Sequence, residues 1–170
     1  MHFSRIIAIL GVLIAGGGFF VMSASSDGED ALPGLNALND AFPTGFDITW
    51  TALYDDTSWA AILYAVLAVV ALVLALLPPL ANPMARAVAW IAVLVGAVMT
   101  TIGVVATMGA MDDAEALEDG FSQAAALGAI PEAWSVDIGF GWYLLVAGGV
   151  VVAIGGLLSA FAKTSEPASA

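Results

Sequence analysis

The stretch that decides the fold is residues 86–119, RAVAWIAVLVGAVMTTIGVVATMGAMDDAEALED. One basic residue, Arg86, comes first, an apolar run fills residues 87–111, and acidic residues begin at Asp112. At about 1.5 Å per helical residue, the apolar run is long enough to cross a hydrocarbon core about 30 Å thick. The stretch therefore predicts a transmembrane helix with positive charge at one end and negative charge at the other.

Three more apolar runs share this character, and none of the four contains Asp, Glu, Lys, Arg or His. In chain order the predicted spans are residues 6–22, 60–77, 87–111 and 138–161. The first two are near the short limit for a span, so their helices are expected to extend into the flanks. The pattern predicts an all-α membrane protein, a four-transmembrane-helix bundle forming a single domain over residues 1–170.

Composition supports this class and excludes others. The chain is 61% hydrophobic and 11% charged, with a mean hydropathy of +0.99, outside the range of soluble globular proteins. Cysteine is absent, which excludes disulfides, thiolate metal ligands and thiol nucleophiles.

The flanking charges predict the orientation. Arg5, Arg86 and Lys163 each lie at the end of an apolar run, and basic residues near helix ends are retained in the cytoplasm. The turn at 78–86, the tail at 162–170 and both termini are therefore predicted to be cytoplasmic, in the cell membrane. The outer segments, 23–59 and 112–137, carry 14 of the 15 acidic residues and are predicted to be extracytoplasmic.

A secretory signal is the competing interpretation of the amino terminus. Met1–Arg5, an apolar stretch and Ser23-Ala24-Ser25 resemble a signal peptide with its cleavage site, and cleavage would leave three spans. The apolar stretch is longer than a usual signal core of roughly 7–15 residues, which favours an uncleaved first helix.

The outer segments are expected to contain short helices that form a compact acidic cap. In the second, Asp112 or Asp113 is expected to cap a separate amphipathic helix whose apolar stripe is Leu117, Phe121 and Ala125. The first shows a shorter stripe of Leu32, Leu35, Leu38 and Phe42. Asp47 and Asp137, each before an isoleucine, are expected to cap the starts of later helices.

Small residues predict close helix packing. Pairs four residues apart let backbones approach, and the candidate packing positions are Gly96, Gly103, Gly148, Gly149, Gly155 and Gly156. Because the glycines of the last run are spread around its helix, they can serve internal packing or leave a small-residue face for a partner, a lipid or a pigment-like apolar molecule; internal packing is favoured. Residues 1–80 and 85–163 also have the outline of a weak parallel repeat, and chance similarity in Ala-rich sequence is an equal alternative.

The missing chemistry limits the function. Proton pumps and ion-coupled transporters need ionisable side chains inside the bilayer, and the four predicted spans contain none. A haem group needs axial ligands, and the one histidine, His2, cannot supply a pair of them. The sequence also contains no phosphate-binding loop and no catalytic constellation. We predict no catalytic residue, no cofactor and no metal. Three basic residues make nucleic acid an unsuitable partner.

The acidic outer segments are the remaining candidate for a binding site, because clustered carboxylates attract cations and basic proteins. A solvated acidic surface, adapted to salt, is the alternative. The candidate docking residues are Asp27, Glu29, Asp30, Asp112, Asp113, Glu115, Glu118 and Asp119.

The predicted protein resembles two known kinds of membrane protein in outline. The predicted topology, with the patch Trp50-Thr51-Ala52-Leu53-Tyr54, resembles tetraspan proteins of the claudin type, but the two cysteines of that family are missing, so no residue role is carried over. Accessory subunits of prokaryotic energy-converting complexes are similar in being small and uncharged within the membrane.

Two functions follow as hypotheses. The first is a non-catalytic accessory or structural subunit of a larger prokaryotic membrane complex, surrounded by lipid bilayer, with an acidic outer cap that docks a basic extracytoplasmic protein. The second is a small oligomeric transporter or pore lined by Thr100, Thr101 and Thr107 of the third run. Sparse polar lining favours the first.

Overall fold

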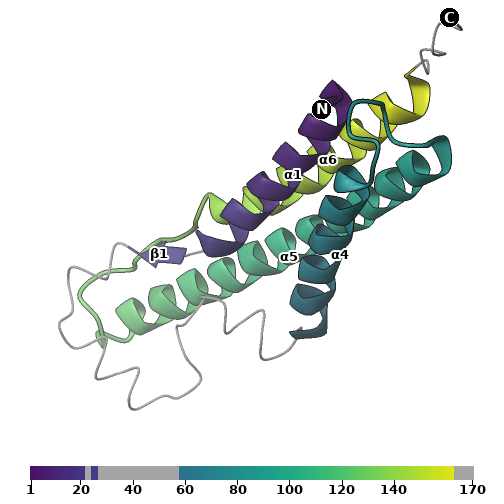
Figure 1. Ribbon diagram of the computed structural model, residues 1–170. Helices are drawn as coiled ribbons and strands as arrows, with labels where there is room; N and C mark the ends of the chain where they lie inside the picture. Colours follow the sequence, from purple (N-terminus) through teal and green to yellow (C-terminus); the bar gives the residue numbers. More distant parts are fainter. Residues whose placement is uncertain (22–23, 27–57, 163–170) are drawn as a thin grey trace, which may run out of the picture.

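The computed structural model describes residues 1–21, 24–26 and 58–162. The described chain forms four helices and a two-stranded antiparallel ribbon (Figure 1). In chain order the elements are α1 (Phe3–Phe20), β1 (Ala24–Ser26), α4 (Ser58–Leu76), α5 (Arg86–Ala126), β2 (Val136–Ile138) and α6 (Gly141–Phe161). The predicted helical architecture is confirmed, and the ribbon is an addition to it.

Three helices are long and apolar enough to cross a membrane. They are α4 from Trp59, α5 and α6, while α1 is a shorter apolar helix. Large apolar side chains are exposed along all of them, for example Leu13 on α1, Val69 on α4 and Val105 on α5. Exposed apolar surface over this length is typical of a membrane protein whose outer surface faces lipid.

Helix α6 packs against both α1 and α5 and lies behind α1 in the view of Figure 1. Its glycines fall on two faces because Gly148 and Gly155 are seven residues apart, as are Gly149 and Gly156. A Cβ atom at Gly148 would lie 2.6 Å from Ala15 on α1, and one at Gly149 would lie 2.6 Å from the Thr100 nitrogen on α5. Real Cβ atoms do not approach backbone so closely, so only glycine fits at these positions.

The same close approach continues along both interfaces. On the α1 side, a Cβ atom at Gly155 would meet Ala8 at 2.6 Å, and one at Gly11 would meet the Val152 nitrogen at 2.6 Å. On the α5 side, a Cβ at Gly96 would meet the Ala153 nitrogen at 2.5 Å and one at Gly103 would meet the Val146 nitrogen at 3.0 Å. A Cβ at Gly156 would meet the Val93 nitrogen of α5 at 2.8 Å, so all six glycines predicted for packing lie at helix contacts inside the bundle.

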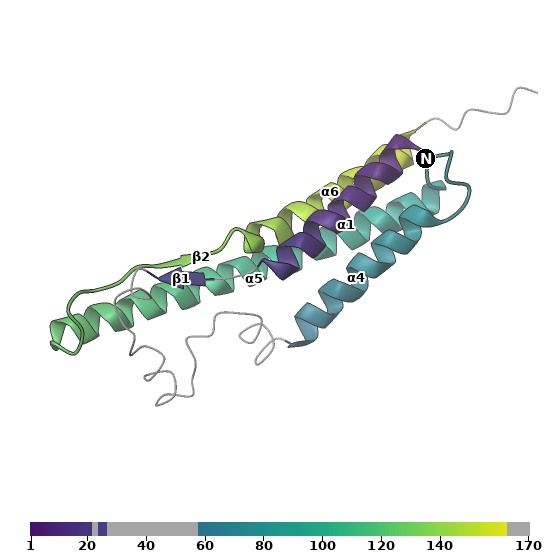
Figure 2. The same cartoon turned by 60° about the vertical axis from the view of Figure 1, so that its left-hand side comes forward.

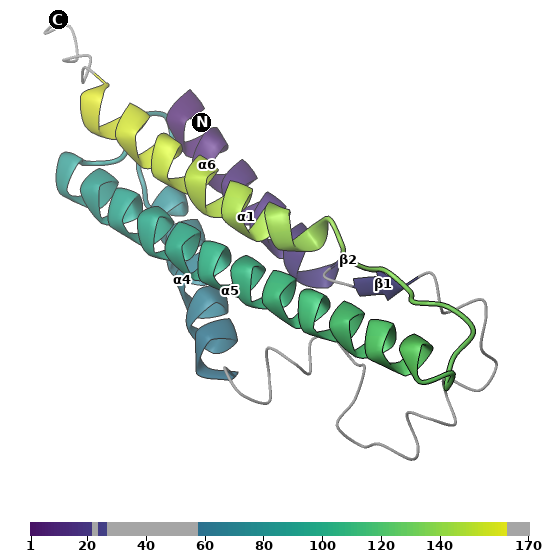
Figure 3. The same ribbon diagram turned by 180° about the vertical axis from the view of Figure 1, so that it is seen from behind.

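Helices α4 and α5 are joined by a non-helical turn, residues 77–85, and pack beside each other (Figure 3). Pro78 and Pro79 come one residue after the end of α4 at Leu76, and proline cannot continue a helix. Towards its other end α4 is held by Tyr64, whose ring stacks on Phe19 of α1 with centroids 6.4 Å apart. Its hydroxyl donates to the Leu145 carbonyl of α6 at 2.7 Å, which satisfies a buried polar group.

The prediction of a separate helix capped by Asp112 or Asp113 is wrong. Both residues lie inside α5, which runs without a break for 41 residues from Arg86 to Ala126, about 61 Å at the rise of a helix. Residues 112–126 include five alanines, two glutamates, one leucine and one glutamine, which are strong helix formers, so the helix continues beyond the apolar run instead of restarting. Its last part projects past the ends of α1 and α6 (Figure 2).

The projecting helix ends at Ala126 with Leu127 as its C-cap, and Gly128, which follows, is the one described residue in a left-handed conformation, with φ +71°. The Gly128 amide donates to the Ala125 carbonyl and the Ala129 amide to the Ala124 carbonyl, both at 2.9 Å. These two bonds form a Schellman motif, which satisfies the last carbonyls of the helix and reverses the chain.

The chain then returns along α5 to β2, which pairs with β1 in the register Ala24 to Ile138, Ser25 to Asp137 and Ser26 to Val136. Asp137 is exposed in this strand, and the residue preceding α6 is Phe140, which makes no side-chain cap bond. The prediction of Asp137 as a helix cap is therefore wrong, because the ribbon and residues 139–140 separate it from the helix. Asp47 lies outside the described residues.

The two halves of the proposed repeat differ in detail. The first helix of one half has 18 residues and its counterpart α5 has 41, and the glycine contacts of α6 have no equivalent on α4 among the described residues. The repeat over residues 1–80 and 85–163 stays a prediction.

The glycine contacts lead to a matched pair of substitutions. We expect Gly149→Ala to destabilise the bundle by about 1–3 kcal/mol, the usual cost of overpacking, because its Cβ would meet the α5 backbone. Gly17→Ala, a helical position with open space around it, should be neutral or stabilising by up to about 1 kcal/mol. Thermal unfolding of both variants in detergent measures the difference, and equal midpoints would contradict the packing.

Candidate functional site

Charged side chains lie at the two ends of the described bundle. One end, here called the turn end, contains the amino terminus, the turn 77–85 and the last residues of α6 (Figure 1). The other contains the outer projection, defined as residues 112–138. The two ends differ in charge, since Arg5 and Arg86 lie at the turn end and the described acidic residues lie in the outer projection.

Arg5 is the centre of the turn end. Its side chain is 2% exposed and donates to four backbone carbonyls: its Nε to Asn82 at 2.7 Å, one terminal nitrogen to Ala75 at 2.9 Å and Leu77 at 2.6 Å, and the other to Pro83 at 3.4 Å. The last carbonyls of a helix lack partners in their own helix and carry partial negative charge. Arg5 supplies both the donors and the charge that the end of α4 needs.

The residues around Arg5 tie α1 to the other elements. The Ser4 and Ser159 hydroxyl oxygens lie 2.6 Å apart, linking α1 to α6, and Ser4 also contacts the His2 ring nitrogen Nδ1 at 2.7 Å. The His2 amide donates to the Leu80 carbonyl of the turn at 2.8 Å. Three elements therefore meet in one hydrogen-bonded cluster.

From the sequence, Arg5 was predicted only as an orientation signal, and its hydrogen bonds to the end of α4 and the turn were not predicted. A usable signal was present: Pro78-Pro79 ends α4 abruptly within apolar sequence, so the free carbonyls there need a donor other than the next turn of helix. The sequence offers only three basic residues, and the guanidinium is the one group able to donate to several carbonyls at once.

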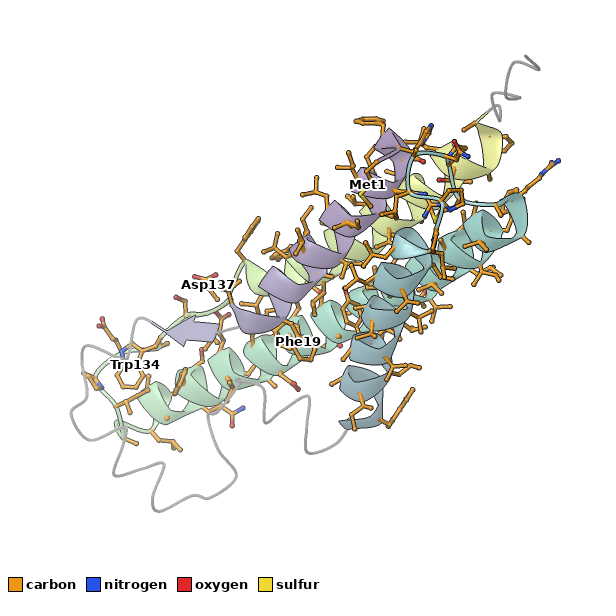
Figure 4. All side chains as sticks on the ribbon, in the orientation of Figure 1. Met1, Phe19, Trp134 and Asp137 are labelled. Carbon is orange, nitrogen blue, oxygen red and sulfur yellow. The ribbon has the colours of Figure 1, made fainter. Side chains whose placement is uncertain are left out.

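The outer projection has a small apolar core of its own. Phe121 on α5 meets Trp134 of the returning chain edge to face, with ring centroids 5.3 Å apart (Figure 4), and Ala114 and Val136 complete the buried set. Leu117, half-buried, packs against it. Two residues of the predicted stripe, Leu117 and Phe121, thus pack on the returning chain of the same protein.

The candidate docking residues on α5 differ in how far their side chains are buried. Glu118 is half-buried, and its carboxylate oxygen Oε1 accepts the Val136 amide at 2.7 Å, so it fastens β2 to α5. Asp112, Asp113, Glu115 and Asp119 are exposed. Helical spacing places Asp112, Glu115 and Asp119 on one side of α5, opposite Phe121; these three residues are here called the acidic face. Asp27, Glu29 and Asp30 lie outside the described residues.

The threonines of the pore hypothesis do not share one surface. The hydroxyls of Thr100, Thr101 and Thr107 donate to the carbonyls four residues earlier, at 2.8, 3.0 and 2.8 Å. Thr101 is exposed, whereas Thr107 is buried and also contacts the Trp142 carbonyl at 3.2 Å. Thr100 lies where Gly149 of α6 makes its closest approach.

Within residues 1–21, 24–26 and 58–162, no group of three or more His, Cys, Asp or Glu side chains is placed to hold a metal ion. The buried indole Nε1 of Trp134 has no hydrogen-bond partner in the same ranges. No protein family, curated protein or solved structure matches this chain.

The arrangement around Arg5 makes a charge-conserving substitution informative. We expect Arg5→Lys to destabilise the protein by about 2–4 kcal/mol. The single ammonium group of lysine cannot reach all the carbonyls that the planar guanidinium binds, so buried carbonyls are left unsatisfied. Arg86→Lys, at an exposed position, should be nearly silent.

Chemical unfolding of the two purified variants checks this prediction. Since both keep the positive charge, the orientation signal is unchanged, and a difference reports the hydrogen bonds. Equal stability of the two variants would show that the carbonyl contacts contribute nothing.

Proposed function

We propose that the protein is a non-catalytic accessory subunit of a larger membrane complex of the prokaryotic, energy-converting type, and that the outer projection docks a basic extracytoplasmic protein. The observation that carries the proposal is the continuity of α5. One helix joins a packed apolar bundle to an acidic surface outside it, which is an arrangement for presenting a surface at a fixed place.

We further propose that α1 is a fourth span and is not removed as a signal. Its contacts with α6 run from Ser4 beside Ser159 to Gly18 beside Gly141, so it covers the same depth as α6. Cleavage at the candidate site Ser23-Ala24-Ser25 would remove Arg5 from the end of α4 and Gly11 from Val152. The charges favour the turn end as cytoplasmic and the outer projection as extracytoplasmic.

The internal contacts support a docking role over a pore. The glycine faces of α6 are occupied by α1 and α5, and the buried hydroxyls of Tyr64, Thr107, Ser4 and Ser159 hold elements together. Thr100 and Thr107 lie where helices touch, and Thr101 on an exposed side, so a shared water path along them would require the bundle to open. The acidic face needs no such rearrangement.

The proposed orientation is tested by cysteine labelling, because the natural chain contains none. Cysteine introduced at Asp119 or at Asp30 should react with an impermeant maleimide added to intact cells, whereas cysteine at Ala81, in the exposed turn, should react only after permeabilisation. The reverse pattern would overturn the orientation.

Neutralising the acidic face tests docking. The triple variant Asp112→Asn, Glu115→Gln, Asp119→Asn should lower recovery of a co-purifying partner several-fold at low salt and flatten the salt dependence, since charge complementarity speeds encounter and is screened by ions.

Mild-detergent purification from native membranes, at low and high salt, provides the measurement. Asp137→Asn, an exposed acid in β2, is the control. A wild-type protein that purifies alone and monodisperse at low salt would overturn the subunit proposal.

A further inference from the structure

The far end of the outer projection is unusually apolar for a solvent-exposed turn. Residues 124–131, Ala-Ala-Ala-Leu-Gly-Ala-Ile-Pro, contain no polar side chain, and they are here called the tip. Leu127 is 86% exposed, the highest value among the described large apolar residues. Ala126, Ala129 and Pro131 are exposed beside it.

The bilayer of the protein's own membrane does not account for this apolar surface. Leu127 lies 15 residues beyond Asp112 along a continuous helix, about 22 Å at the rise of an α-helix. Five acidic residues occupy the helix between the apolar span and the tip. The tip therefore stands clear of the lipid that covers the apolar sides of the bundle.

The tip is held in one conformation. The Leu127 amide donates to the Gln123 carbonyl at 3.1 Å, and the two bonds of Gly128 and Ala129 close the turn. Ile130 packs against the core of Phe121 and Trp134. A preformed apolar surface loses little conformational freedom when it binds, which favours affinity.

The negative charge around the tip indicates which kind of molecule can bind there. Residues 112–137 include no basic residue and seven acidic ones: Asp112, Asp113, Glu115, Glu118, Asp119, Glu132 and Asp137. A second copy of this chain would bring the same negative charge, and an anionic lipid surface would also be repelled. A protein surface carrying Lys and Arg around an apolar hollow is attracted by the acids and covers the tip.

We propose that the tip is the apolar anchor of the docking surface, with Leu127 inserting into an apolar socket rimmed by Lys and Arg on the partner protein. This inference rests on the proposed docking function. The tip is too small for a stable interface by itself, so the acidic face beside it contributes the remaining contact, and the anchor supplies the buried centre of the interface.

Site-specific photocrosslinking in native membranes tests the anchor. Benzoylphenylalanine at position 127 should give one major adduct, with a protein whose crosslinked peptide contains an apolar residue flanked by Lys or Arg. The same probe at Val105, exposed on the apolar span of α5, should not give it. An adduct with a second copy, with lipid, or with residues 27–57 of the same chain would overturn the proposal, as would no adduct.

A substitution series separates this inference from the docking function itself. Leu127→Ser should reduce recovery of the crosslinked partner about tenfold, the loss expected when a buried leucine contact disappears, while Leu127→Met should retain it. Because Leu127 is exposed, neither change should alter the unfolding midpoint. If neutralising the acidic face reduces recovery and Leu127→Ser does not, docking stands and the anchor fails. If neither has an effect, both fail.

Discussion

The close approach of α6 to its two neighbours is the constraint on which the other contacts depend. Between helices in hydrocarbon, burial of apolar surface supplies no driving force, so association relies on close van der Waals contact and on hydrogen bonds. Gly148 and Gly155 bring α1 against one face of α6, and Gly149 and Gly156 bring α5 against another. With α1 and α5 positioned in this way, Arg5 reaches the end of α4 and Tyr64 reaches the Leu145 carbonyl.

Helix α4 is attached differently from the other three. Arg5 donates to carbonyls at the last turn of α4, and Tyr64, in the first half of α4, donates to the Leu145 carbonyl of α6. Buried hydrogen bonds of this kind are directional, so they specify where α4 lies more narrowly than its apolar surface does. Helix α4 thus packs through buried small residues such as Ala71 and Ala75, and these two polar contacts add a directional constraint on its position.

The sequence was sufficient to predict the helices and their order but not how far each extends. Apolar run length predicted α4 and α6 to within a few residues, since the bilayer imposes that length. It failed for α5, because a change from apolar to acidic residues ends the apolar run and does not end the helix. Helix ends are set by local signals, and the relevant one was Gly128.

The roles of individual charged residues were less predictable still. Arg5 and Glu118 both bind backbone groups that are distant in sequence, and such pairings depend on tertiary packing that no periodicity reports. The acidic face, in contrast, could be predicted as exposed, because Asp112, Glu115 and Asp119 follow helical spacing opposite an apolar stripe.

The unbroken α5 has a mechanical consequence. The helix contains no proline between Arg86 and Ala126 and runs without a break, and sharp kinks arise mainly at such breaks, so the outer projection and the apolar part of α5 share one axis. A displacement of the outer projection would therefore have to be accommodated where α5 packs on α6, for example at Gly96 and Gly103, and not at a hinge within the helix.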